Sequence, residues 1–310
     1  MTQYGSPSPD SSDHSLYFDF YGAVTRLSVT QADIDAALFY FGGQRIAPVS
    51  VKETDVQVTL DCTEWPSRGF FTSLLRKDGL AKRIQVDQRT DSQWQRVADH
   101  TFTTWSSIPS PLPPFRHSSL WNTLAVAAGT CLRLPDSSGL LLTGDNYVGK
   151  TSTALELCDR GARLISDSLA VLNVNTGYFL RHDSPIGFRR ASRRQHLAKI
   201  TSIIHQETVS PDTGLVLLAR PEDVLGRPNL DRAKVQHVVR LVRHEAQTGH
   251  ASWQETDTSR WFSGVDPADI RSQLPPRTRI VTVAPEATPS ETAQQILDSL
   301  DGALTAEATC

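Results

Sequence analysis

The sequence predicts an α/β protein in which a domain with a central mixed sheet flanked by helices follows a smaller α+β N-terminal domain. In the middle of the chain, the apolar run 140–142 precedes a glycine-rich loop, a segment of helical periodicity that ends near Gly161, and the apolar segment 163–172. This order of strand, loop, helix and strand is typical of α/β domains. The proline-rich segment 106–116 separates it from an N-terminal region of different pattern.

The N-terminal region, 15–105, is predicted to mix strands with short helices. Residues 15–22 and 56–60 alternate in polarity as strands do, and 30–41 has apolar residues at helical spacing after Thr30 as N-cap. The aromatic residues that gather here predict a small core rather than a ligand platform: Phe18, Phe20, Tyr21, Phe39, Tyr40, Phe41, Trp65, Phe70 and Phe71. Residues 1–14, rich in Ser, Pro and Asp, predict a disordered tail.

The second domain is predicted to span 117–302, after a stiff linker at 106–116 and before a loose tail at 303–310. Its later elements are read from short apolar runs and turn residues. The expected strands are 177–181, 215–219, 235–242 and 279–283, with a loop at 182–190, a helical turn at 221–225 and a final helix at 289–300 capped by Ser290.

Composition excludes several classes of protein. With 39% hydrophobic and 21% charged residues, the 310-residue chain reads as an ordinary globular protein. A net charge of −3 gives no electrostatic footprint for nucleic acid or an anionic membrane. No apolar run is long enough to span a bilayer, and the polar N-terminus is unlike a signal peptide. The four cysteines lack metal-ligand spacing, so we expect free thiols in a cytoplasmic protein.

The glycine-rich loop fits the phosphate-binding motif G-x-x-x-x-G-K-[ST] between Gly144 and Thr151. Its glycines allow backbone N–H groups to converge on an anion, and the following helix adds the positive end of its dipole. Lys150 would meet the outer phosphates of ATP, and the Thr151 hydroxyl would ligate Mg²⁺. The residues expected to bind the nucleotide are Gly144, Asp145, Asn146, Tyr147, Val148, Gly149, Lys150, Thr151 and Ser152.

A carboxylate and a cation complete the predicted site. Asp167 interrupts an apolar strand shortly after the loop, so it is expected at the strand end, facing the phosphates and able to hold Mg²⁺. Arg189 is the candidate for positive charge around the migrating phosphate, in competition with Arg181, Arg190 and the pair 193–194. Tyr147 has three open roles: stacking on the base, lining an acceptor pocket, or covering the loop.

The stretch GDNYVGKTSTALELCDRGARLISDS, which starts at Gly144, resembles the catalytic core of the bacterial HPr kinase/phosphorylase family, whose pattern is approximately G-D-S-G-V-G-K-S-E-x-A-L-E-L-x-x-R-G-H-x-L-V-A-D-D. The matching positions are Gly144, Asp145, Val148, Gly149, Lys150, Ala154, Leu155, Glu156, Leu157, Arg160, Gly161, Leu164 and Asp167. The resemblance implies a P-loop kinase domain, ATP as donor, and Asp167 as catalytic base. The family forms hexamers, so a homo-oligomer is one expectation.

The chain departs from this pattern at informative positions. Asn146 and Tyr147 replace Ser-Gly, Ala162 replaces the usual His, and Ser168 replaces the second Asp of the D-D pair. The family's second signature is missing downstream. The chain therefore looks more like the divergent relatives found beside natural-product genes, including those that phosphorylate lasso-peptide precursors.

The leading functional hypothesis is a Mg·ATP-dependent kinase that transfers the γ-phosphoryl group to a hydroxyl. The acceptor would be a serine of a peptide or protein, or a small metabolite. The alternative is a catalytically inactive nucleotide-binding scaffold or regulator, which the substituted loop and the missing second aspartate favour. An ATP hydrolase that drives a conformational change ranks last, because motor-like sensor motifs are missing.

Overall fold

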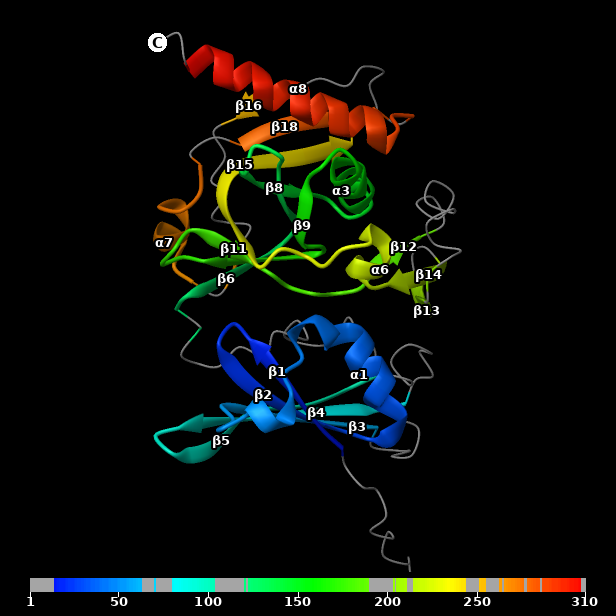
Figure 1. Ribbon diagram of the computed structural model, residues 1–310, viewed down its shortest axis with the longest axis vertical. Coiled ribbons are helices and arrows are strands. Elements are labelled where there is room, and N and C mark those ends of the chain that lie inside the picture. Colours follow the sequence, from blue (N-terminus) through cyan, green and yellow to red (C-terminus); the bar gives the residue numbers. More distant parts are fainter. Residues whose placement is uncertain are drawn as a thin grey trace, which may run out of the picture. The chain divides into compact units, whose positions relative to one another are not determined.

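The computed structural model describes residues 14–62, 70, 80–103, 120, 122–189, 203, 205–210, 214–243, 251–254, 262–263, 265–275, 278–284 and 286–307 (Figure 1). The chain divides into two compact units, Met1–Ser118 with Gln206–Leu217, and Ser119–His205 with Leu218–Cys310. The sequence had assigned 206–217 to the second domain. The predicted tail up to residue 13, the segment 106–116, Trp65, Phe71, Arg190 and residues 193–194 lie outside the described residues.

The first unit contains a five-stranded mixed sheet in the order β1-β2-β3-β4-β5. Its strands are β1 (His14–Phe20), β2 (Ala23–Val29), β3 (Val56–Cys62), β4 (Lys82–Thr90) and β5 (Gln93–Phe102). All neighbours are antiparallel except β2 and β3, which are parallel. The predicted strands correspond to β1 and β3, whereas β2, β4 and β5 lie outside the predicted strands. Lys82 and Gln88 occupy buried positions of β4 and weaken its apolar alternation.

The predicted helix 30–41 is divided into a 3₁₀ turn, η1 (Gln31–Asp33), and the helix α1 (Ile34–Phe41). Thr30 does not cap it as expected. Its side chain makes no capping hydrogen bond; the hydroxyl instead donates to Oδ2 of the buried Asp33 at 3.4 Å. Two further 3₁₀ turns follow, η2 (Gly42–Gln44) and η3 (Pro48–Ser50).

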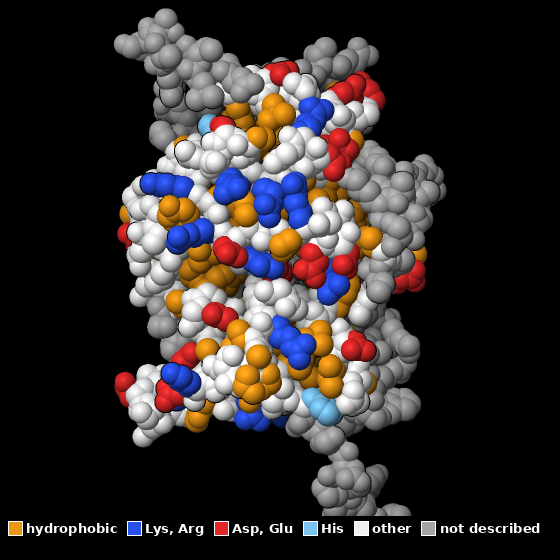
Figure 2. Space-filling view, in the orientation of Figure 1, with side chains coloured by type: hydrophobic (Ala, Val, Ile, Leu, Met, Phe, Trp, Pro, Cys, Tyr) orange, Lys and Arg blue, Asp and Glu red, His pale blue; other side chains and the backbone are white. Residues whose placement is uncertain are grey.

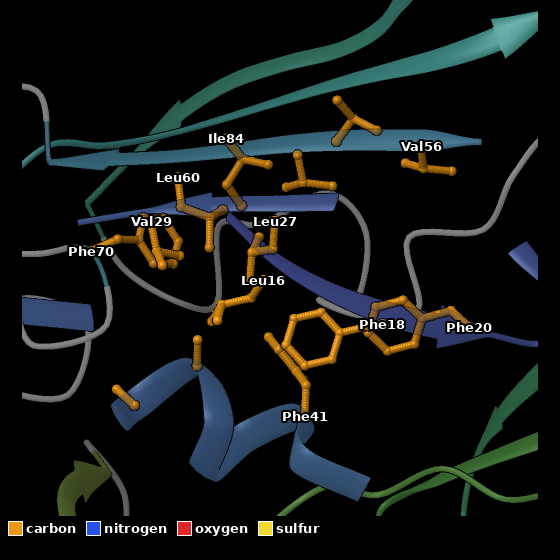
Figure 3. Close-up of a cluster of buried hydrophobic side chains, with 14 of the residues drawn as sticks. Leu16, Phe18, Phe20, Leu27, Val29, Phe41, Val56, Leu60, Phe70 and Ile84 are labelled. Atoms are coloured by element: carbon orange, nitrogen blue, oxygen red, sulfur yellow. The ribbon is translucent and has the colours of Figure 1, made fainter. Parts of the chain in front are cut away.

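Six of the aromatic residues named from the sequence belong to a core, in which Phe18, Phe20, Phe41 and Phe70 are buried and against which Tyr21 and Tyr40 pack, whereas Phe39 is not part of it. Figure 3 shows α1 facing the sheet, with Phe18, Phe20 and Phe41 packed between them. Phe41 lies edge-on to the other two rings, at centroid distances of 5.8 and 6.0 Å. Alternate positions of β2 and β3 add aliphatic side chains from the same face of the sheet. The apolar side chains of the first unit therefore form a core between α1 and one face of the sheet.

The second unit has a mixed ten-stranded sheet with the path β17-β6-β10-β11-β15-β8-β7-β9; β18 pairs with β15, and β16 pairs with β18. The strands that come first in the chain are β6 (Leu124–Ala128), β7 (Thr130–Arg133), β8 (Gly139–Gly144), β9 (Arg163–Ser166), β10 (Leu169–Asn173) and β11 (Tyr178–Leu180). The later ones are β15 (Arg232–Arg243), β16 (Ala251–Gln254), β17 (Phe262–Ser263) and β18 (Thr278–Val283).

Strand β15 joins the two halves of this sheet. Its first residues pair antiparallel with β11, and its later residues lie between β8 and β18, parallel to both. The carboxyl ends of β8, β15 and β18 therefore meet at one edge, where open α/β sheets bind ligands. The glycine-rich loop leaves β8 at this edge.

Helices α3 (Lys150–Asp159) and α8 (Pro289–Glu307) lie beside these parallel strands (Figure 1). Arg160, just after α3, donates to the backbone carbonyl and the hydroxyl of Ser290 at 3.0 and 2.9 Å. The cap of α8 is Thr288 and not Ser290, because Glu291 N–H donates to the Thr288 hydroxyl while the Glu291 carboxylate accepts from Thr288 N–H. The helix continues to Glu307, past the expected end at 300.

The remaining elements are short. Helices α6 (Pro221–Leu225) and α7 (Pro267–Arg271) are single turns, and a three-stranded sheet has the order β12-β14-β13. Its strands are β12 (Ile186–Phe188), β13 (His205–Ser210) and β14 (Gly214–Ala219). The predicted loop 182–190 thus contains a strand. Within the described parts of the chain, no helix has the length and apolar character needed to cross a bilayer.

The structure is therefore a mixed α/β protein with several mixed sheets and few helices.

Candidate functional site

The loop between β8 and α3 depends on two glycines. Gly144 ends β8 with φ 135°, and a Cβ there would lie 2.3 Å from the carbonyl oxygen of Leu241 on β15. Gly149 is the N-cap of α3 and has φ 106°, in the left-handed region that glycine adopts without steric cost. Gly144 therefore lets the loop pack closely against β15 where it leaves the sheet, and Gly149 lets the loop turn directly into α3.

Lys150 begins α3, and its side chain turns back over the loop. Its ammonium donates to the carbonyl oxygens of Gly144 and Asp145, both at 2.8 Å. Burial lowers the pKa of Lys150 and the charge of Arg189 also lowers it, whereas the carboxylates of Asp167 and Asp145 raise it. The cation is thus held at the loop, with charges of both signs near it.

Asp167 lies between β9 and β10, and its carboxylate is surrounded by hydroxyl donors. It is 2% exposed, and its Oδ1 accepts a hydrogen bond of 2.6 Å from the buried Thr130 of β7. The Thr151 hydroxyl lies 3.1 Å from both carboxylate oxygens, and that of Ser168 lies 3.3 Å from Oδ2. The sequence-predicted pair Asp167 and Thr151 is therefore in direct contact.

The turn that carries Asp167 is fixed from a second side. Ser184 donates its hydroxyl to the Asp167 carbonyl at 3.0 Å, and His182 N–H donates to the Ile165 carbonyl. Burial lowers the pKa of His182 to about 4, so its imidazole is neutral at pH 7. Burial has the opposite effect on the Cys131 thiol: it raises the pKa, so the thiol stays protonated. The hydrogen bonds of Ser184 and His182 therefore fix the backbone of the turn that carries Asp167.

Tyr147 protrudes from the loop, with φ 67° and a relative exposure of 44%. The guanidinium carbon of Arg189, which follows β12 directly, lies 4.9 Å from the centre of the Tyr147 ring. Arg243, the last residue of β15, donates from Nη2 to the Tyr147 carbonyl at 3.3 Å. Arg189 is therefore beside the loop, as the sequence predicted.

The other predicted residues divide by exposure. Asp145 and Asn146 are exposed at the tip of the loop, whereas Val148 and Ser152 are buried. Arg181, a competitor of Arg189, forms ion pairs with Asp183 at 2.6 Å and Asp231 at 3.7 Å instead. Figure 2 shows Lys and Arg side chains gathered on the visible face of this unit, despite the net negative charge of the chain.

The donor set is chemically suited to Mg²⁺. Carboxylate and hydroxyl oxygens are the hard ligands that Mg²⁺ prefers, and the ion is commonly held by one or two carboxylates together with substrate phosphates. Among the described residues, no three His, Cys, Asp or Glu side chains gather as a self-sufficient metal site. A cation here would have Asp167 and Thr151 as protein ligands and would need phosphate oxygens as further ligands, as expected for a nucleotide-bound ion.

Sequence reasoning missed Thr130, Arg243 and Ser184. Thr130 lies in β7, which carries no motif, and only the pairing of β7 with β9 brings it to Asp167. Arg243 closes a strand whose place beside β8 is a tertiary fact. Ser184 stood within the predicted polar loop 182–190, but nothing in the sequence singled it out.

Comparisons with known proteins found likenesses among solved structures. No protein-family model matches the sequence, and no curated protein matches it. Among solved structures, the chain is similar to the Hpr(Ser) kinase/phosphatase from Coxiella burnetii, at 14% identity and a TM-score of 0.32. The match covers 56% of this chain and 95% of that one.

Proposed function

We propose that this protein is a Mg·ATP-dependent kinase that transfers the γ-phosphoryl group to a hydroxyl. The observation that carries the proposal is the contact of Asp167 with Thr151, directly beside the glycine-rich loop and Lys150. Phosphoryl transfer depends on positioning and on charge stabilisation, and this arrangement brings a loop, a cation and a carboxylate together at the first turn of α3.

Each residue then has a defined task. Backbone N–H groups of the loop and the N-terminus of α3 bind the phosphates, and Lys150 exchanges its carbonyl partners for the outer phosphate oxygens. Thr151 and Asp167 hold Mg²⁺, which when bound would neutralise charge on the phosphate chain. Arg189 adds positive charge near the migrating group. The hydroxyl of the acceptor approaches from the exposed side of the loop.

Asp167 has two tasks to which its carboxylate is suited: holding the cation and accepting the proton of the acceptor hydroxyl. The hydroxyl donors Thr130, Thr151 and Ser168 already engage its oxygens, which supports the cation-holding task. The two tasks have different consequences for binding. Loss of a cation ligand weakens the Mg²⁺ dependence of nucleotide affinity, whereas loss of a proton acceptor leaves that affinity unchanged and stops transfer.

The acceptor that we propose is a serine of a peptide or protein, or a small metabolite, in natural-product tailoring or regulation. The supporting observation is that the loop tip, Asp145 to Tyr147, is exposed, and that Asn146 and Tyr147 differ from the resembled kinase pattern. A cytoplasmic location and a homo-oligomeric assembly belong to the same proposal.

The decisive experiment is calorimetric titration with ATP, with and without Mg²⁺, on the wild type and on Lys150→Ala. Binding in the wild type that is lost in Lys150→Ala supports the proposal, and an acceptor search by phosphate-shift mass spectrometry then follows. Lys52→Ala is the matched control, because Lys52 is an exposed lysine of the first unit. Equal affinities in the wild type and Lys150→Ala would refute the phosphate-binding role of the loop.

Asp167→Asn tests the transfer step. We expect it to abolish transfer, and its Mg²⁺-dependent affinity separates the two tasks of the carboxylate. Unchanged turnover would remove Asp167 from the mechanism. Nucleotide binding without transfer, even in a full cell extract, would instead favour the catalytically inactive scaffold, which the substitution of the second aspartate by Ser168 supports.

A further inference from the structure

Tyr147 is a bulky residue in a backbone conformation that favours glycine. Its φ of 67° falls in the left-handed region, which large side chains adopt only where surrounding contacts compensate the strain. The resembled kinase pattern has glycine at this position. A side chain retained here despite the strain suggests that the ring contributes an interaction, and the structure gives that interaction a partner.

The partner is Arg189. Its guanidinium carbon lies 4.9 Å from the ring centre, within the range of about 6 Å over which a cation is attracted to an aromatic face. Arg189 is exposed and directly follows β12, whose last residue is Phe188. The ring provides the surface on which the guanidinium rests.

The backbone of Tyr147 is also held. Arg243 donates to its carbonyl at 3.3 Å, and Val148 N–H donates to the Asp145 carbonyl at 3.4 Å within the same turn. The backbone from which the ring extends is therefore held by contacts within the protein. Arg189 is close enough for its charge to add to burial in lowering the pKa of Lys150, so both cations act on the same loop.

We propose that Tyr147 is a positioning residue that holds the guanidinium of Arg189 over the phosphate loop, where it meets the outer phosphates of the nucleotide. The inference rests on the proposed function and deepens it. It assigns Tyr147 to the phosphate end of the nucleotide, and it excludes base stacking as the main contribution of the ring.

The test uses a ligand without a base. Mg²⁺·tripolyphosphate and Mg²⁺·ATP are titrated calorimetrically into the wild type, Tyr147→Leu, Tyr147→Phe, Arg189→Gln and the double variant. If the ring acts through Arg189, Tyr147→Leu weakens both ligands by the same factor, about 5-fold, which corresponds to about 1 kcal/mol. Tyr147→Phe keeps an aromatic face and stays within about twofold of the wild type. The double variant binds no more weakly than Arg189→Gln alone.

A second variant guards against a folding defect. Tyr147→Gly removes the ring and relieves the backbone at φ 67°, so it must weaken tripolyphosphate by the same factor as Tyr147→Leu. Weaker ATP binding with unchanged tripolyphosphate binding in both variants indicates base stacking and overturns the inference alone. A wild type that binds neither ligand, or binds both as well as Lys150→Ala does, overturns the proposed function and the inference with it.

Discussion

The hydrogen bond from Thr130 to Asp167 makes a quantitative prediction about the site. The two oxygens are 2.6 Å apart, and the residues are 1% and 2% exposed, so water cannot replace the donor. Thr130→Val keeps the shape of the side chain and removes only the hydroxyl. A hydrogen bond to a charged group contributes about 1.5–3 kcal/mol, so we expect the free energy of unfolding to fall by that amount.

Thermal and urea unfolding of purified protein measure this loss. For a unit of this size the midpoint should fall by about 3–12 °C, since each kcal/mol shifts it by about 2–4 °C. Thr130→Ser is the matched control: it keeps the hydroxyl and loses one buried methyl group, at a cost of about 1 kcal/mol. We also expect turnover of Thr130→Val to drop by up to about 100-fold, because Asp167 loses a group that orients it.

A Thr130→Val protein as stable as the wild type would refute this reasoning, as would a Thr130→Ser protein that is equally or more destabilised. Either result would mean that the Thr130 hydroxyl does not stabilise the carboxylate. A stability loss with unchanged turnover and unchanged Mg²⁺-dependent affinity would limit Thr130 to the fold.

Three further predictions concern stability. Gly144→Ala should cost about 3–4 kcal/mol because its Cβ would meet the Leu241 carbonyl at 2.3 Å, whereas Gly226→Ala, with φ 64° and open space around it, should cost about 1–2 kcal/mol by urea unfolding. Burial lowers the pKa of His182 from an ordinary 6.5 to about 4, so as pH falls the unfolded chain binds a proton at this residue before the folded chain does. The full contribution of neutral His182 to the free energy of unfolding is therefore present above pH 6.5, and about 3 kcal/mol of it is lost as pH drops to about 4. His182→Asn should flatten that pH dependence in thermal scans, and a slope that persists would assign it to other groups. Phe41→Ala should destabilise the first unit by about 3–5 kcal/mol, as the ring is 3% exposed and packs edge-on against two others, while Phe41→Leu should cost clearly less.

The local sequence is sufficient to predict the loop, the strand before it and the helix after it. The apolar run before Gly144, the helical periodicity after Lys150 and the glycine near position 161 correspond to β8, α3 and the end of that helix. These features depend on contacts between residues close in sequence, and glycine conformations and helix periodicity are local properties. The position of Asp167 between two strands follows from the same local pattern.

Strands β4 and β5 were not predicted, because their sequences show little alternation of apolar and polar residues. Strand β5 is exposed along nearly its whole length, so its sequence has no apolar alternation to reveal it. Strand β4 buries Lys82, whose ammonium donates a hydrogen bond to the Leu80 carbonyl at 2.7 Å. In both strands the pairing partner, rather than the residues themselves, supplies the reason for extended structure.

The sequence by itself determined the glycine-rich loop, the candidate residues Lys150, Thr151 and Asp167, and an α/β organisation around them. Only the tertiary structure decided which distant groups complete the site: Thr130 against the carboxylate, and Arg189 with Arg243 around Tyr147. Motifs record short-range geometry, because a loop and the helix after it are fixed by adjacent residues. Contacts across a sheet depend on strand order and register, which the sum of weak long-range interactions selects and no single stretch of sequence encodes.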